Sequence, residues 1–137
     1  KSRKTGFSQK AFVFNKKGKF LAMRRTATAP SNPLKWDLPG GDVEFGEDPI
    51  ASIKREIKEE TGLIAKTLTP FDVEGHINPL REYWITIAYK TFDAKGKLSI
   101  SWEHDLYKWV TLEEFLKLKT TKKLRRFART LKKIQKA

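Results

Sequence analysis

The feature that most constrains this chain is a helix whose two ends can be read directly from the sequence. Asp48 is a good N-cap, Pro49 suits the first helical position, and Gly62 suits the left-handed residue that follows a helix C-terminus. Between these ends, three acidic residues share one helix face about 100° wide. They are Glu56, Glu59 and Glu60. The sequence thus predicts a capped helix with an acidic face.

That acidic face calls for a cation. Like charges three and four residues apart destabilise a helix by a few tenths of a kcal/mol per pair unless a positive group lies between them. A stripe of isoleucines runs directly beside the glutamates, so the acidic face borders buried surface, where unpaired carboxylates are costly. The alternative is a solvated helix screened by its own basic residues. The preceding Gly40–Gly41 pair favours the cation site, because glycines let a backbone carbonyl approach a ligand.

Residues 41–63 resemble the Nudix box at every position that this motif specifies. A chance match to seven fixed identities and two aliphatic positions has a probability on the order of 10⁻⁹ at a given start. Residues 36–40 and 103–114 also resemble the segments that flank the box in this family. The nine matching positions are Gly41, Glu47, Arg55, Glu56, Ile57, Glu59, Glu60, Gly62 and Leu63. The resemblance implies an α/β fold of the Nudix type, an α/β/α sandwich with a mixed central sheet.

The resemblance also implies a set of metal ligands. Glu56, Glu59 and Glu60 are the expected carboxylates, and the carbonyl of Gly41 is a further ligand. Clustered carboxylate oxygens select hard cations, so Mg²⁺ is the expected ion, with Mn²⁺ as a substitute. Glu103 is a candidate for a distal carboxylate that completes the cluster, and a surface glutamate is the alternative.

Three further roles follow from the same resemblance. Arg55 and Glu47 are expected to orient the loop and helix through a buried ion pair, whose disruption would cost roughly 3 to 5 kcal/mol if it were fully buried. The box does not fix the general base, so Glu56 and Glu103 compete for that role. His76 and His104 are interpreted as surface or structural residues.

The implied reaction is hydrolysis of a nucleoside diphosphate linked to another group, by a pyrophosphohydrolase that acts on acid anhydrides. Bound Mg²⁺ neutralises a diphosphate and makes a bound water acidic enough to attack it. An ordinary or oxidised nucleoside triphosphate is the first expected substrate, and ADP-ribose is the second. The alternatives are a Nudix-fold module that senses a nucleotide or binds nucleic acid, and a hydrolase of RNA caps.

The substrate itself is weakly specified. Pro79 lies 16 residues after Leu63, a spacing that resembles the subfamily acting on ADP-ribose, but Asn78-Pro79 is also an ordinary turn dipeptide, and the turn is favoured. Trp84 can line a base pocket or belong to the core. The candidate substrate-binding residues are Arg24, Arg25, Phe45 and Tyr83.

Length and composition indicate one domain. A chain of 137 residues is large enough for a single core and too short for two ordinary ones. No apolar run approaches a membrane span, and the absence of cysteine excludes disulfides and thiolate zinc sites. These features fit a cytoplasmic protein. Because the chain begins at Lys1, it leaves open whether a native N-terminal segment precedes it, and the oligomeric state and source are also open.

The net charge of +13 is concentrated at the C-terminus. Residues 120–137 carry eight Lys or Arg and no acidic residue, and apolar residues recur there every three or four positions. This predicts a basic amphipathic helix at about 120–137. We favour a helix that packs its apolar stripe on the domain over one that contacts nucleic acid or an anionic membrane. The stripe consists of Leu124, Phe127, Leu131 and Ile134.

Alternating and apolar segments predict the strands. A hairpin of residues 8–15 and 19–24 is expected to open the fold, and a second helix is expected to begin after Thr111. Tyr83, Ile85, Ile87 and Tyr89 alternate within the clearest strand. The other expected strands are a short one at Trp36, residues 64–73, residues 81–92 and residues 98–102.

Overall fold

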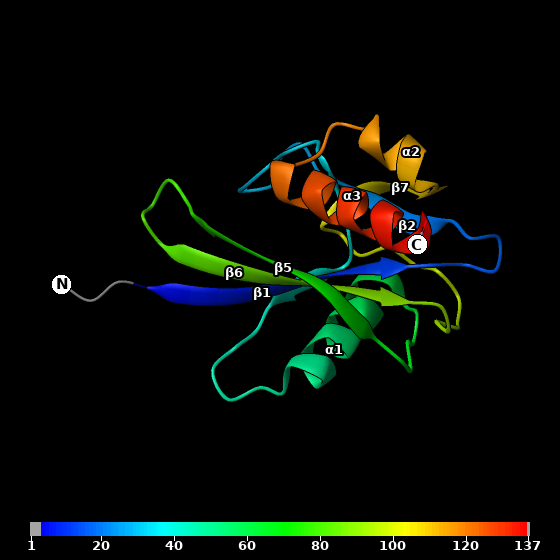
Figure 1. The fold of residues 1–137 in the computed structure, drawn as a ribbon, viewed down its shortest axis with the longest axis horizontal. Helices are drawn as coiled ribbons and strands as arrows, with labels where there is room; N and C mark the ends of the chain where they lie inside the picture. The colour runs from blue at the N-terminus through cyan, green and yellow to red at the C-terminus, as the bar shows by residue number, and fades with distance from the viewer. Residues whose placement is uncertain (1–3, 137) are drawn as a thin grey trace.

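A computed structural model describes residues 4–136 and has helices on both faces of a mixed sheet (Figure 1). Helix α1 (Pro49–Thr61) covers one face, and helix α3 (Lys122–Lys136) covers the other, close to the short helix α2 (Leu112–Leu116). The predicted α/β fold with a mixed sheet is confirmed. Among the described residues, no helix has the length and apolar character needed to cross a membrane.

The strands form two sheets. The four-stranded sheet has the order β4-β1-β6-β5, in which β1 is parallel to β6 and the other pairs are antiparallel. The three-stranded sheet has the order β3-β2-β7 and is antiparallel. The strands are β1 (Thr5–Val13), β2 (Phe20–Arg25), β3 (Trp36–Asp37), β4 (Gly40–Asp42), β5 (Thr69–Ile77), β6 (Tyr83–Thr91) and β7 (His104–Val110).

The prediction that β1 and β2 form a hairpin is wrong beyond the turn. Asn15 and Lys19 close the expected turn, and Phe14 bridges Phe20, but the two strands then separate into different sheets. The reason is competition for the edges of β1. The strand pairs with β6 along its whole length, while its other edge is taken by β4 and by the carbonyl of Pro39, which accepts from Ala11.

The predicted strand at residues 98–102 is also wrong. Ser99 and Ser101 instead donate their backbone N–H groups to the carbonyls of Thr61 and Glu60 at the end of α1, at 2.9 and 3.0 Å. Terminal helix carbonyls lack partners within the helix, so this segment completes α1 rather than extending a sheet. The strand that follows is β7, and the strand predicted at 64–73 begins later, at Thr69.

Helix α1 has the predicted ends. The Asp48 side chain accepts from the N–H of Ala51, Pro49 is in the first turn, and Gly62 has a left-handed φ of 77°. Ile53 and Ile57 are fully buried against the four-stranded sheet. The predicted caps are confirmed, and the buried isoleucines fix which side of the helix faces the sheet.

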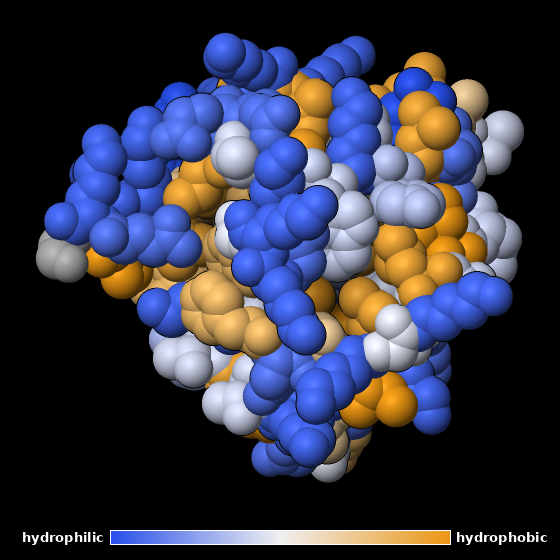
Figure 2. Space-filling view, turned by 90° about the vertical axis from the view of Figure 1, so that its right-hand side faces the viewer, coloured by the Kyte–Doolittle hydropathy of each residue, from blue (hydrophilic) through white to orange (hydrophobic). Residues whose placement is uncertain are grey.

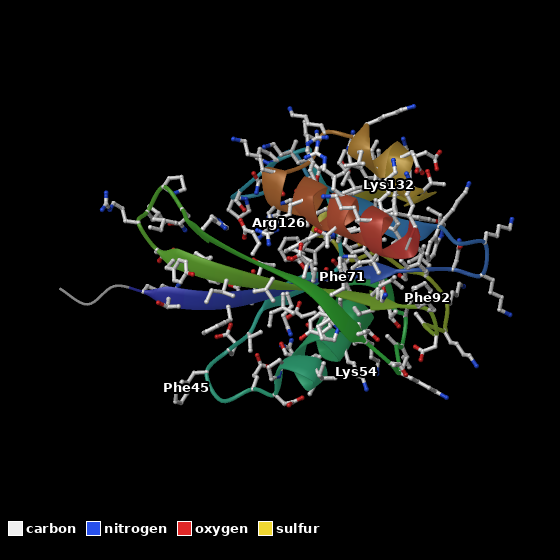
Figure 3. All side chains as sticks on the ribbon, viewed as in Figure 1. Phe45, Lys54, Phe71, Phe92, Arg126 and Lys132 are labelled. Carbon is white, nitrogen blue, oxygen red and sulfur yellow. The ribbon has the colours of Figure 1, made fainter. Side chains whose placement is uncertain are left out.

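Helix α3 packs on the domain as the sequence predicts. Leu124, Phe127 and Leu131 are buried in the larger core, against which Phe71 of β5 packs (Figure 3), whereas Ile134 is 40% exposed near the end of the helix. The Thr111 cap of α2 is confirmed and includes a reciprocal bond with Glu114. Hydrophilic side chains cover much of the face in Figure 2 and break up its apolar areas.

Candidate active site

Several of the predicted site residues line one cavity of about 380 Å³. Gly41 belongs to β4, Glu56 and Glu60 project from α1, and Glu103 lies just before β7 at an exposed position. Residues distant in sequence therefore place three of the predicted carboxylates around the same space, together with Asp37, Asp42 and Glu44. Arg25 of β2 also lines this cavity, and its role in substrate binding stays a prediction.

Glu60 is the most deeply buried of these carboxylates, with 7% of its surface exposed. Its Oε1 accepts from the backbone N–H of Gly40 at 3.2 Å. Burial raises the pKa of Glu60 to about 8, since Lys10 and the Gly40 N–H only partly offset the burial and the charges of Asp37 and Glu103. A carboxyl group in this environment favours a proton or a cation.

Glu56 lies directly against the backbone of β4. A Cβ atom placed on Gly41 would lie 2.8 Å from the Glu56 carboxyl carbon, so a side chain at position 41 would displace that carboxylate. Burial raises the pKa of Glu56, and the neighbouring Glu59 adds to this against the opposing charge of Arg55. The glycine predicted from the motif thus has a steric role in placing Glu56.

An ion-paired cluster that the sequence reasoning missed forms another wall of the cavity. The Lys10 ammonium lies 2.9 Å from Asp37 Oδ1, and Arg25 approaches the other oxygen of Asp37 at 3.4 Å. Burial would lower the pKa of Lys10, but Asp37 and then Glu60 outweigh it, and the pKa is raised. A lysine in the otherwise buried stretch of β1 was the available signal for this cluster.

His104 is a second residue of the cavity whose position was not predicted. It is 6% exposed, and neither ring nitrogen has a hydrogen-bond partner among the described residues. Burial lowers the pKa of the imidazole despite the nearby carboxylate of Asp37. His104 is therefore part of the cavity wall, and its interpretation as a structural residue stays a prediction.

The ion pair of Arg55 and Glu47 forms, but it is not buried. The guanidinium lies 3.0 Å from Glu47, and it also contacts Glu56 and Glu59 at 3.1 Å each. The Arg55 side chain is 42% exposed and that of Glu47 is 28% exposed. The expectation of a buried pair is therefore wrong, because both residues lie on the outer side of the loop and helix, and a large loss of stability does not follow.

We predict that Glu47→Gln lowers activity without a comparable loss of stability. Glu47 accepts from the N–H of Glu44 and holds Arg55, which contacts Glu56, so its loss frees the loop beside the cavity. A small misplacement of reacting groups costs up to about 10²-fold in rate. Measured kcat/KM should fall while Tm changes little. A large Tm decrease with unchanged kcat/KM would instead assign this pair a purely structural role.

The remaining predicted residues lie outside the carboxylate cavity. Glu59 is 57% exposed and contacts Arg55, and Arg24 forms two hydrogen bonds of 2.9 Å with Asp105. Phe45 is fully exposed on the loop before α1 and points away from the protein (Figure 3). Tyr83 is 44% exposed beside Gly75. None of these four residues lines the carboxylate cavity, and their roles as metal-binding or substrate-binding residues stay predictions.

The donor set fits a hydrated Mg²⁺ ion. Among residues 4–136, no three acidic or histidine side chains form a closed metal cage. Mg²⁺ does not need such a cage, because it retains several waters and binds through one or two carboxylates plus substrate phosphates. Glu56 and Glu60 both project from α1 into the cavity, and burial raises the pKa of both, so a bound cation would offset the cost of burying their charged forms.

Comparison with known proteins matches this geometry to one family. Residues 5–131 match the NUDIX domain. The structure resembles that of the MutT protein from Methanosarcina mazei Go1, with a TM-score of 0.88, 28% identity, and coverage of 100% of this chain and 99% of that one.

Two curated relatives are named RNA pyrophosphohydrolase. That of Bartonella clarridgeiae is 30% identical over 127 residues, which cover 74% of this chain and 73% of the relative. That of Acidiphilium cryptum (strain JF-5) is 40% identical over 58 residues, which cover 42% of this chain and 35% of the relative. The match thus spans about a third of the second relative's length.

Proposed function

This chain belongs to the NUDIX family, and we propose that it is a Mg²⁺-dependent pyrophosphohydrolase of nucleoside diphosphates linked to another group. The observation that carries the proposal is the meeting of Glu56, Glu60 and Glu103 around one cavity that Lys10 and Arg25 also line. Carboxylates suit a hard cation, and Lys10 and Arg25 suit the phosphates of the substrate.

The residues around the cavity would have three roles, namely metal binding, orientation of the substrate and proton transfer. Glu56 and Glu60, with the backbone of Gly41, would hold the ion, and Mg²⁺ would supply charge neutralisation and an acidic bound water. Lys10 and Arg25 would orient the diphosphate, since their positions are fixed by Asp37. Glu56 and Glu103 remain the candidates for the base that takes a proton from the attacking water.

We propose a nucleoside triphosphate as the first substrate to test, and ADP-ribose as the second. The segment around Asn78 supports this order, because it forms the turn that was the alternative to an ADP-ribose motif. The carbonyl of Asn78 accepts from the N–H of Arg81, and the N–H of Asn78 donates to the carbonyl of Glu82, at the tip between β5 and β6. The names of the two curated relatives add the triphosphorylated end of RNA to the panel, and capped RNA is the comparison substrate.

The test is a panel of these compounds with and without Mg²⁺. We expect Mg²⁺-dependent release of a nucleoside monophosphate from at least one of them, and much slower release by the Glu56→Gln variant. Product analysis by chromatography identifies the bond that is cut. Absence of turnover for every diphosphate on the panel would refute the enzyme proposal.

A nucleic-acid-binding role for α3 is less well supported. Several of its basic side chains already have partners within the domain: Arg125 donates to the carbonyls of Leu116 and Leu118, and Lys132 lies 3.5 Å from Glu113. The first contact restricts the Arg125 side chain, and the second partly neutralises Lys132, so both make these groups less available to a phosphate backbone. Salt-dependent RNA or DNA binding that is lost when the exposed Lys122, Lys133 and Lys136 of α3 are replaced by glutamine would favour this alternative over the enzyme.

A further inference from the structure

A second cavity adjoins the carboxylate cavity and has the opposite electrical character. Its volume is about 310 Å³, and it shares Lys10, Arg25, Asp37 and Asp42 with the first cavity. Four lysine or arginine side chains line it, against two aspartates. The cavity therefore has an excess of positive charge. Asp37 does not offset the other cations, because it is already paired with Lys10 and Arg25.

Lys123 is a cation of this cavity whose hydrogen bond goes to a neutral group. It extends from the first turn of α3 and donates to the hydroxyl of Thr86 at 3.1 Å, and it forms no ion pair within residues 4–136. Thr86 is fully buried and its hydroxyl lies 2.6 Å from that of Ser8. Burial and the nearby charge of Lys10 both lower the pKa of Lys123. The charges of Asp37, Glu74 and Asp42 oppose this shift, but the only hydrogen bond of the Lys123 ammonium among the described residues is to the neutral hydroxyl of Thr86.

The helix around Lys123 adds to this excess. Lys122 and Lys123 occupy the first turn of α3, which contains no acidic residue, although the N-terminal end of a helix already carries partial positive charge. Arg126, one turn further along, differs, because it pairs with Asp72 of β5 at 3.2 Å (Figure 3). The nearby Glu74 contacts His76 at 3.0 Å and forms no ion pair with Lys123. An anionic ligand would stabilise this end of the helix.

We propose that the second cavity is a subsite for a phosphate group of the substrate outside the scissile diphosphate, bound by Lys123, while Lys10 and Arg25 at the shared wall contact the diphosphate. This inference rests on the proposed function for the position of the diphosphate in the adjoining cavity. The substrate class is then a nucleoside diphosphate derivative with an additional phosphate, either a phosphomonoester or the phosphodiester that links a second nucleotide.

Binding by nucleotides that contain no diphosphate bond tests this subsite without turnover. Isothermal titration calorimetry in buffer with Mg²⁺ would compare AMP, adenosine 3′,5′-bisphosphate and the dinucleotide pApA. We expect the bisphosphate to bind about tenfold more tightly than AMP, as one additional charge-assisted contact implies. Tighter binding of pApA than of AMP would identify the phosphodiester as a source of the bound group.

Variants of α3 assign the effect to Lys123. Lys123→Gln should remove the advantage of the bisphosphate, whereas Lys123→Arg should retain most of it. Lys133→Gln removes the same charge from an exposed position on the same helix and should leave the advantage unchanged. Equal binding of AMP and the bisphosphate, or an advantage that survives in Lys123→Gln, would overturn the proposal. Tight bisphosphate binding without hydrolysis of any diphosphate would refute the proposed function alone.

Discussion

Replacing Glu56 with glutamine is expected to lower kcat by about 10² to 10⁴-fold, the range seen when a general base or a comparable charged group is removed. Glu56 lies against Gly41 within the carboxylate cavity, so it is placed either to hold the ion or to accept a proton. Glutamine keeps the shape of the side chain, and Tm should change little. Steady-state kinetics at saturating Mg²⁺ and a thermal melt measure the two quantities.

Glu103→Gln is the matched comparison for this experiment. Glu103 is exposed at the rim of the same cavity, whereas Glu56 is partly buried. Loss of the acidic limb of the pH profile of kcat/KM in only one of the two variants would assign the general base to that residue. A Glu56→Gln enzyme that retains more than about a tenth of wild-type kcat would contradict the placement of Glu56 at the reacting centre.

The second large effect concerns stability in the absence of metal. Burial raises the pKa of Glu60 to about 8, above the ordinary glutamate value of 4.5. A group whose pKa is raised by folding stabilises the folded state fully below the lower pKa, and that contribution is lost as the pH rises through the higher one. In EDTA, the free energy of unfolding should therefore fall between about pH 4.5 and pH 8, by a few kcal/mol in total.

The variant Glu60→Gln isolates this effect from other titrating groups such as His104. Glutamine has no charge to bury and its amide oxygen can still accept from Gly40, so the variant should be more stable than wild type at pH 8 in EDTA and close to it near pH 5. Added Mg²⁺ should stabilise the wild type at pH 8 and leave the variant almost unchanged. Equal urea denaturation curves for both proteins at pH 8 in EDTA would disprove the assignment.

The elements that the sequence predicted best are those whose signals are local. Asp48, Pro49 and Gly62 define both ends of α1 within the helix itself, and Thr111 likewise caps α2. The predictions of the hairpin and of the strand at 98–102 were wrong because the backbone pairing of these segments depends on residues distant in the sequence. Strand β1 pairs with β4 and β6, and the backbone N–H groups of residues 99 and 101 donate to carbonyls at the end of α1.

The same distinction separates the predicted from the missed site residues. The motif named Glu56, Glu60 and Gly41, which line the cavity, but it also named Glu59, which lies outside it, so spacing along the helix predicted only part of the set. Lys10 and His104 lie in strands from opposite ends of the chain, and they reach the cavity only because the two sheets bring β1 and β7 beside α1. No pattern within either strand specifies that meeting.

The close approach of Gly41 to Glu56 has a genetic consequence. Any side chain at position 41 would enter the space of the Glu56 carboxylate, so the two positions share one function although 15 residues separate them. Substitutions in contact are not additive. Gly41→Ala should therefore be severe in the wild type and nearly neutral for activity once Glu56 is already replaced by alanine. The two positions would behave as a single epistatic unit, in which a change at either one conceals the effect of a change at the other.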